Sequence, residues 1–443
     1  MKRLFKNIYL QPRFFKVIVA LVILFILGYM YPTIYSISIM LFYTFVFTLF
    51  ADCILLYKQK GINATRVLPK KLSNGDYNKI EIQLENSYNF PVELTLIDEL
   101  PFQYQKRDFE IDTTLKKSEL KKITYNLRPI ERGEYHFGNL NVYVTSPINL
   151  LSRRFQFGKD AMAPNYPSFL QLRQYMLMAF SNRINEFGLK KIRRIGHTME
   201  FEQIKEYVQG DDIRNINWKA TAKKNQLMIN QFQDEKSQPV YSVIDKGRVM
   251  KMPFNGLTLL DYAINATLVI SNIALMKQDK AGMMTFSSKI ENRVVAERRP
   301  AQMNLILETL YNVDTNFTEP DFSRLYTEIK RTINQRSLLL LYTNFETLDA
   351  LHRQLPYLQA LAKNHLLVVI FFENTELKKA TEKKAVSTYD IFQKTIAEKF
   401  VFEKKLIVNE LRKHGIQTIL TNPENLTVNT INKYLEIKAR GLL

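Results

Sequence analysis

One short segment holds most of the residues that could do chemistry. It reads GHTMEFEQIKEYVQGDDIRNINWKATAKK and spans residues 196–224. Carboxylates can act as general acid or base, and a nearby cation can act as an electrophile. No nucleophile–base pair accompanies them, so the segment supports a hydrolase only weakly. The charged side chains that could take part are Glu200, Asp211, Asp212, Arg214 and Lys219.

The same segment also has the residues of a structural joint. Its apolar side chains could anchor two neighbouring domains, and they are Phe201, Tyr207, Ile216 and Trp218. Gly210 begins a tight turn, and Arg214 can form a bidentate pair with a nearby carboxylate. In a third interpretation Trp218, Arg214 and Lys219 are exposed and bind a partner. The structural and partner-surface interpretations can both hold, and both are favoured over catalysis.

The composition limits the possible classes of protein. The 443 residues suffice for two or three domains, and the single cysteine, Cys53, excludes a disulfide framework and a cysteine-based zinc site. The net charge of +19 suggests an anionic partner, either nucleic acid or a membrane surface. No nucleic-acid-binding signature occurs, so we expect membrane lipid and not nucleic acid. The basic residues that flank the apolar N-terminus are Lys2, Arg3, Lys6, Arg13, Lys16, Lys58, Lys60, Arg66, Lys70 and Lys71.

Two long apolar runs follow the N-terminus. Residues 14–30 and 34–57 are nearly free of charge and are separated by a short turn that contains Pro32. A helix rises about 1.5 Å per residue and the hydrocarbon core is about 30 Å thick, so each run can span a bilayer. Residues 1–60 are therefore predicted to form a transmembrane hairpin. A cleaved signal peptide would be shorter and would not precede a second span.

The charges that flank the two spans predict their orientation. Lysine and arginine lie before the first span and after the second, and the turn has none. The positive-inside rule then places both ends in the cytoplasm, with the protein a multi-pass component of the inner membrane. Asp52 lies inside the second span, and we expect it to reach the headgroups or to pair with Lys58.

The soluble part divides into three regions. Residues 61–157 alternate apolar and polar side chains between turn signals, which predicts an antiparallel β-sandwich-like domain without a catalytic constellation. Residues 158–235 form a connector that contains the charged segment. Residues 236–443 alternate apolar strands with helical patterns, which predicts a doubly wound α/β domain.

The α/β domain lacks the glycine-rich motifs of nucleotide-binding proteins, so no cofactor is predicted. Ligands of such sheets meet the loops at the carboxyl ends of the strands. The loops expected at that edge contain Asp245, residues 285–287, residues 343–345 and residues 314–318.

The charged segment resembles the signature of the bacterial family called domain of unknown function 58. The match runs G-x-x-x-E-F-x-x-x-K-x-Y-x-x-G-D-D-x-R-x-I-x-W-K-A-T-A-K, with Lys205 where the family more often has arginine. The resemblance extends over essentially the whole chain, including the two spans. The signature residues, which are also the candidate interface, are Gly196, Glu200, Phe201, Tyr207, Gly210, Asp211, Arg214, Trp218 and Lys219.

This resemblance implies that residues 236–443 form a von Willebrand factor type A-like domain. Such domains often hold Mg²⁺ through Asp-x-Ser-x-Ser after the first strand, plus a later threonine and aspartate. Here the motif begins at Asp245, but Gly247 and Val249 supply no hydroxyl and Asn344 replaces the later aspartate. Because Mg²⁺ needs about six oxygen ligands, this degenerate site is not expected to bind metal.

The resemblance also implies a partner, a MoxR-type AAA+ ATPase that remodels or activates a client protein. We therefore predict a non-enzymatic, membrane-anchored cytoplasmic scaffold or adaptor that mediates protein–protein interactions, with neither catalytic nor cofactor-binding residues. The alternative is a membrane-bound hydrolase that uses the carboxylates of residues 196–224. The identity of the client does not follow from the sequence.

Overall fold

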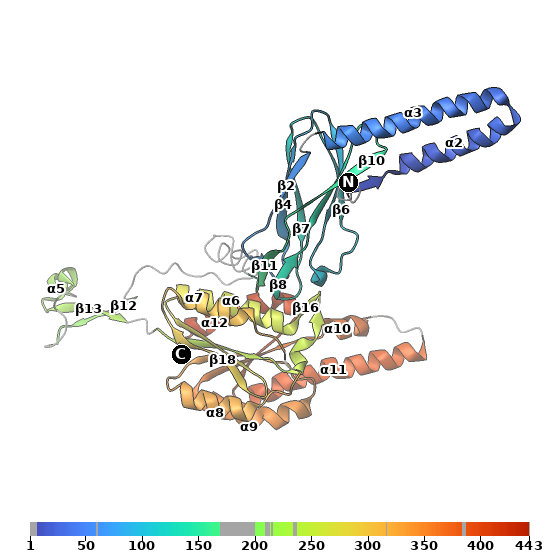
Figure 1. Ribbon diagram of the computed structural model, residues 1–443. Coiled ribbons are helices and arrows are strands. Elements are labelled where there is room, and N and C mark those ends of the chain that lie inside the picture. The colour runs from blue at the N-terminus through green and yellow to red at the C-terminus, as the bar shows by residue number, and fades with distance from the viewer. Residues whose placement is uncertain are drawn as a thin grey trace. The chain divides into compact units, whose positions relative to one another are not determined.

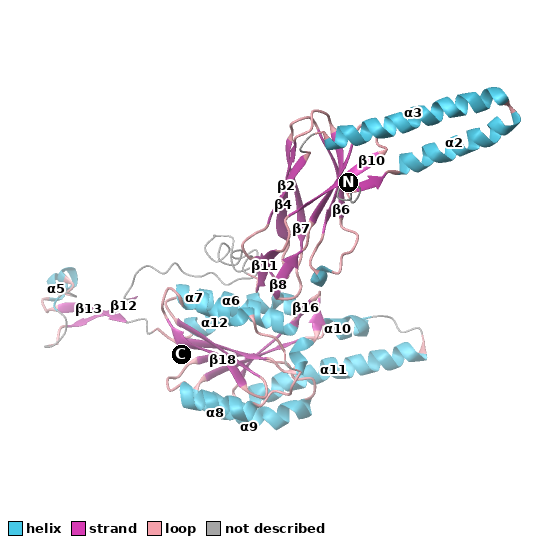
Figure 2. Cartoon of the chain, in the orientation of Figure 1, coloured by secondary structure: helices cyan, strands magenta, loops and turns pink. Residues whose placement is uncertain are grey.

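The computed structural model describes residues 7–58, 61–168, 200–208, 213, 216–233, 237–315, 317–382 and 387–442. The chain forms two compact units, Met1–Tyr166 and Pro167–Leu443 (Figure 1). The first unit consists of a helical hairpin and a β domain, and the second is mainly an α/β domain (Figure 2). This multi-domain layout agrees with the sequence prediction.

Two apolar helices form the hairpin, α2 (Pro12–Met30) and α3 (Pro32–Tyr57). A proline begins each helix, where its missing N–H costs no hydrogen bond, and Tyr31 alone joins them. Both helices are long and apolar enough to cross a membrane, and most of their side chains are exposed. Exposed apolar side chains on this scale are typical of a lipid-facing surface, so the chain has the features of a membrane protein.

A third helix also has the composition of a membrane span, but its surroundings differ. Helix α6 (Leu259–Met276) has 78% of its most apolar window buried inside the second unit. A helix that is apolar on all sides is either a membrane span or the core of a domain, and burial identifies α6 as a core helix.

The base of the hairpin packs on the β domain. Strand β1 (Ile8–Leu10) pairs antiparallel with β10 (Leu151–Phe157) immediately before α2 begins. One face of α3 contacts the apolar core of the β domain, and its contacting residues are Phe45, Leu49, Cys53, Leu56 and Tyr57. Further contacts come from the carbonyl of Leu56, which accepts hydrogen bonds from the Tyr88 hydroxyl at 2.9 Å and from Arg153 Nη1 at 2.7 Å.

Asp52 lies at this junction, and the expectation that it would pair with Lys58 or reach the headgroups was wrong. The side chain is fully buried. Its Oδ2 accepts the backbone N–H groups of Leu150 (3.2 Å) and Leu151 (2.9 Å), and its Oδ1 accepts the hydroxyl of Ser146. Three donors from the β domain thus satisfy a carboxylate that would be costly in lipid.

The β domain has two principal sheets that share one core. One has the strand order β1-β10-β9-β5-β6 and the other β2-β4-β7, and both are antiparallel; a small third sheet is β3-β11-β8. Apolar side chains at alternate positions of both principal sheets meet in the core, as in a sandwich. The remaining strands are β2 (Ile62–Val67), β3 (Leu72–Ser73), β4 (Asn78–Asn86), β5 (Val92–Asp98), β6 (Glu110–Leu115), β7 (Leu120–Leu127), β8 (Gly133–Phe137), β9 (Leu140–Thr145) and β11 (Ala161–Tyr166).

The second unit is built on a six-stranded sheet with the order β18-β17-β14-β19-β20-β21. All neighbours are parallel except β18, which pairs antiparallel with β17 at one edge. The strands are β14 (Pro239–Asp245), β17 (Lys280–Phe286), β18 (Ile290–Glu297), β19 (Leu338–Tyr342), β20 (Leu366–Phe372) and β21 (Gln417–Thr421).

Helices cover both faces of this sheet (Figure 1). Helices α6, α7 and α12 pack on one face, and α8, α9 and α11 pack on the other. The predicted doubly wound architecture is present. The helices other than α6 are α7 (Gln302–Tyr311), α8 (Phe322–Thr332), α9 (Leu348–Asn364), α10 (Thr375–Glu382), α11 (Thr388–Lys413) and α12 (Leu426–Ala439).

We predict that Asp52→Ala destabilises the first unit. The substitution leaves two buried backbone N–H groups and the Ser146 hydroxyl without their acceptor, and each unsatisfied donor costs about 1–3 kcal/mol. The free energy of unfolding should therefore fall by about 3 kcal/mol or more. Thermal unfolding of the detergent-solubilised protein, followed by circular dichroism, measures the loss.

Asp112→Ala is the matched control for this prediction, because the Asp112 carboxylate is exposed and, among the described residues, accepts only the Thr95 hydroxyl, at 2.7 Å. Asp52→Asn keeps one acceptor oxygen and should lose less stability than Asp52→Ala. Equal melting curves for Asp52→Ala and Asp112→Ala would show that the buried carboxylate does not hold the hairpin to the β domain.

Candidate functional site

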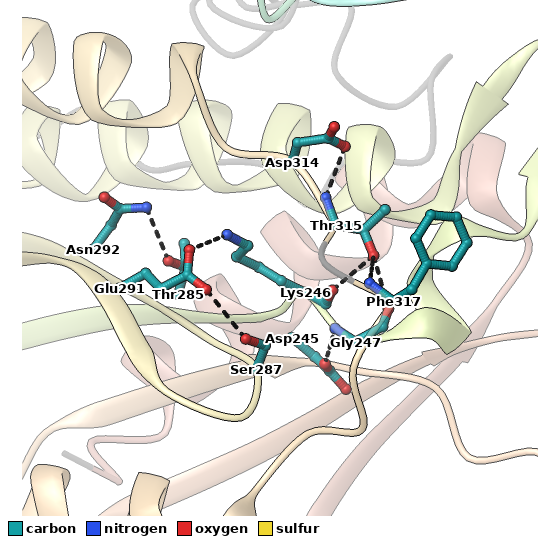
Figure 3. Close-up of polar contacts among 10 residues, drawn as sticks. All are labelled: Asp245, Lys246, Gly247, Thr285, Ser287, Glu291, Asn292, Asp314, Thr315 and Phe317. Atoms are coloured by element: carbon teal, nitrogen blue, oxygen red, sulfur yellow. Dashed lines mark hydrogen bonds and ion pairs between the residues drawn. The ribbon is translucent and has the colours of Figure 1, made fainter.

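Asp245 is at the carboxyl end of β14, next to the point where the strand order reverses between β14 and β19. Its side chain is fully buried. Oδ1 accepts the backbone N–H of Gly247 at 2.7 Å (Figure 3). Oδ2 accepts the hydroxyl of Thr343 at 2.7 Å. Burial raises the pKa of Asp245 to about 6, and the two hydrogen bonds only partly oppose this shift.

The next residue, Lys246, turns its amine away from Asp245 and toward β18. Its side chain is buried, and Nζ forms an ion pair with Glu291 (Figure 3). The other oxygen of Glu291 accepts the hydroxyl of Ser287 at 3.2 Å. The loops that follow β14 and β17 are thus joined by a lysine, a glutamate and a serine of the chain itself.

A third loop lies against the first one. The hydroxyl of Thr315 donates to the backbone carbonyl of Lys246 at 2.8 Å, and the Thr315 N–H donates to the carboxylate of Asp314 at 2.7 Å (Figure 3). Loops after β14, β17 and β19 and the loop at residue 315 therefore converge at one edge of the sheet, as the strand pattern predicts.

The fourth loop is held by a residue that the sequence did not suggest. Lys404, from the middle of α11, donates to Asn344 Oδ1 at 2.6 Å and to the backbone carbonyl of Phe345. Burial lowers the pKa of Lys404 to about 8, and the neighbouring Glu346 partly opposes this change. The only sequence signal is a lysine within the apolar face of a long helix, and it does not identify a partner 60 residues away.

A cavity of about 260 Å³ lies beside Lys404 at the same edge of the sheet. Its walls are largely apolar and include Phe254, Phe372 and Phe400, while Glu346 and Glu373 also line it. An apolar wall with a few polar groups is typical of a site for a small ligand or for a partner's side chain.

The residues at this edge do not fit Mg²⁺. Both oxygens of Asp245 already accept hydrogen bonds, and the Asn344 oxygen is occupied by Lys404. A serine at position 247 would not fit either, because a Cβ there would lie 2.8 Å from Cδ of Pro320. Within the described ranges, no three histidine, cysteine, aspartate or glutamate side chains are grouped so that they could hold a metal ion.

The charged segment of residues 196–224 is described only in part. Strand β12 (Glu200–Glu206) pairs antiparallel with β13 (Met228–Gln233), and α5 (Trp218–Lys224) lies between them in sequence. Asn217 caps α5 by accepting the N–H of Ala220 at 3.0 Å. These contacts make a β-hairpin with one short helix.

The candidate interface residues of this segment fall into three groups. Trp218 is 70% exposed, Lys219 is exposed, and Tyr207 is half-buried and donates its N–H to the carbonyl of Leu227 at 2.8 Å. For two residues the structure describes only the backbone, and for four others it describes nothing. The two are Glu200 and Phe201, and the four outside the described residues are Gly196, Gly210, Asp211 and Arg214. The proposed acid–base pairs of the hydrolase alternative therefore also lie outside the described side chains.

Comparison with known proteins identifies a family that matches part of the second unit and a relative of the chain. Residues 203–380 match the family described as "Protein of unknown function DUF58". The chain is also 27% identical over 220 residues to "Uncharacterized protein YeaD" of Bacillus subtilis (strain 168). That alignment covers 47% of this chain and 54% of YeaD, so the chain spans about half the length of this relative.

Two solved structures show partial likeness. The conserved hypothetical protein BatB from Bacteroides thetaiotaomicron matches with a TM-score of 0.30 and 11% identity, over 46% of this chain and 100% of that one. The PapD-like domain 7 of human CEP192 matches with a TM-score of 0.19 and 12% identity, over 24% of this chain and 84% of that one.

We predict that Asp245 makes the stability of the second unit depend on pH. Its pKa is about 6 in the folded chain and is ordinarily 3.8, so the folded state binds the proton more tightly. This contribution is complete below about pH 4 and is lost as the pH rises through about 6, a change of about 3 kcal/mol. Asp245→Asn removes this titration. The free energy of unfolding of the variant should therefore rise relative to that of the wild type between about pH 4 and pH 7. Urea unfolding at a series of pH values measures the difference, and parallel curves would contradict the assignment.

Proposed function

We propose that this chain, which belongs to the DUF58 family, is a membrane-anchored adaptor that binds other proteins and not an enzyme. The observation that supports this function is the set of contacts between side chains at the sheet edge that contains Asp245. Its polar side chains are engaged with one another: Asp245 with Thr343, Lys246 with Glu291, and Lys404 with Asn344. An edge held closed by internal contacts suits a rigid binding surface better than a site that must activate a substrate.

The α/β domain is, in this proposal, a von Willebrand factor type A-like domain that has exchanged its metal site for lysine contacts. Two features support this view. Asp245 ends the first strand of the sheet, and the loops that contain Thr315 and Asn344 lie at the same edge. The ammonium group of Lys404 supplies positive charge at the loop of Asn344, the position of the later metal-ligating aspartate, while Lys246 pairs with Glu291.

The hairpin gives the adaptor its location, which we propose to be the inner membrane. Arg13 and Lys16 lie at the start of α2, Lys58 follows α3, and the turn at Tyr31 has no charge. By the positive-inside rule, the β domain and the α/β domain are then both in the cytoplasm.

The partner in this proposal is a MoxR-type AAA+ ATPase, which would act together with the chain on a client protein. The support is the resemblance of the charged segment to the family signature, together with the exposure of Trp218 and Lys219 on α5. Exposed tryptophan with an adjacent cation is common among residues that dominate binding at protein interfaces.

We predict the topology from the charges that flank the hairpin. In a Cys53→Ser background, Tyr31→Cys should react with a membrane-impermeant maleimide on intact spheroplasts, because the turn faces outward. Lys117→Cys, on the exposed loop between β6 and β7, should react only after lysis. The reverse pattern would place the soluble units outside the cytoplasm and would end the proposal of a cytoplasmic adaptor.

We also predict that the full-length protein, purified from detergent-solubilised membranes, brings with it a MoxR-type AAA+ ATPase identified by mass spectrometry. Trp218→Ala should reduce this recovery severalfold, because it removes an exposed aromatic anchor. Tyr389→Ala is the control and should leave recovery unchanged, since it removes a similarly exposed aromatic side chain (69%) far from α5 in sequence, on α11. Recovery of no such ATPase, from any growth condition in which both proteins are expressed, would contradict the proposal.

A further inference from the structure

Strand β21 forms one edge of the six-stranded sheet. It pairs in parallel with β20, and in the part of the chain that the structure describes it pairs with no strand on its other side. An edge strand leaves about half of its backbone N–H and C=O groups directed outward, where another strand can pair with them. The five residues of β21 offer a pairing length of about 17 Å.

A groove of about 570 Å³ follows this free edge. Helix α11 contributes one wall and α12 contributes the other, while β21 forms the floor. The groove therefore lies alongside the strand edge with which an extended chain would pair. The lining residues that matter for recognition are Lys405 and Arg412 of α11, Thr418 and Leu420 of β21, and Asn429 of α12.

The charged side chains of the groove that have no ion-pair partner among the described residues are positive. Its two carboxylates already have partners, Glu373 with Lys378 at 3.6 Å and Glu436 with Lys433 and Arg440 at 3.3 and 2.9 Å. Lys405 and Arg412 are exposed, and neither has an ion-pair partner among the described residues. The two cations that remain unpaired both lie on α11.

The spacing of these two cations suits a strand. Lys405 and Arg412 are two helical turns apart on one face of α11, a separation of about 10 Å along the helix axis. Carboxylates on one face of an extended chain recur about every 7 Å, and the long side chains of lysine and arginine can accommodate the difference. Alternating acidic side chains could therefore meet both cations.

We propose that the groove along β21 binds an extended acidic segment of a partner protein, which adds to the sheet as a further strand. This inference rests on the proposed adaptor function and names the chemistry of one partner. A second copy of the chain is a poorer occupant, because symmetric pairing of two β21 strands would bring both sets of unpaired cations to one interface. Recognition combines backbone hydrogen bonds with two charge-assisted contacts.

The test uses the full-length protein in detergent micelles and a short fluorescein-labelled peptide of alternating valine and glutamate. Fluorescence anisotropy should show saturable binding that weakens as salt is added. An otherwise identical peptide that is N-methylated at alternate amides should not bind, because it cannot pair with β21. A valine–lysine peptide should not bind either. Failure of the glutamate peptide to bind, or equal binding of its N-methylated form, would overturn the proposal.

Charge-reversal variants locate the site. Lys405→Glu combined with Arg412→Glu should weaken binding at least about tenfold, through loss of two contacts and added repulsion. Lys394→Glu combined with Lys399→Glu reverses the same charge elsewhere on α11, outside the groove, and should bind like the wild type. Equal losses in both double variants would mean that only net charge attracts the peptide, and would overturn the groove as its site.

Hydrogen exchange provides a readout on the wild-type chain that does not depend on the folding of any variant. The glutamate peptide should slow amide exchange in β21, and unchanged exchange there would contradict strand addition. The outcomes also separate the two proposals. If the ATPase is recovered but the peptide does not bind, the adaptor remains and the groove is wrong. If the peptide binds without recovery of the ATPase, only the identity of the partner is wrong.

Discussion

A carboxylate inside an apolar helix is the constraint on which the first unit depends. Asp52 would destabilise α3 in lipid, yet it is fully buried against Ser146, Leu150 and Leu151 of the β domain. The cost of desolvating the charge is offset only when the three donors are in place. The hairpin and the β domain must therefore fold against each other, and a mispositioned hairpin leaves both a buried charge and two backbone N–H groups unsatisfied.

In the second unit, too, buried polar groups are satisfied by charged side chains, but here the charges are those of lysines. At the carboxyl edge of its sheet, the loops converge and their polar groups must be satisfied without water. Lys246 meets Glu291, and Lys404 meets the oxygens of Asn344 and Phe345. Gly247 allows Pro320 to approach so closely that a longer side chain would have to displace it. The edge is thus held by side chains that reach across the fold.

The elements were predictable because their signals are local. The apolar length of α2 and α3, the alternation in β4 and β5, and the buried strands β14 and β20 are each encoded within a few consecutive residues. The tertiary polar contacts were not predictable. Asp52 meets Ser146 from 94 positions away, and Lys404 meets Asn344 from 60. Such pairs depend on which faces pack together, and periodicity does not contain that information.

The junction at Asp52 also determines which part of α3 can be in contact with acyl chains. Phe45 and Leu49 already contact the β-domain core on one face of α3, so the part of α3 that acyl chains can surround on all sides is residues 32–44, about 20 Å long. Helix α2, with 19 residues, is about 28 Å long. Helix α2 is thus longer than the part of α3 that lipid can surround, and only the face of α3 that points away from the β domain can make up the difference. A thicker bilayer would have to thin locally around the hairpin, so the protein should favour membranes of ordinary or lesser thickness.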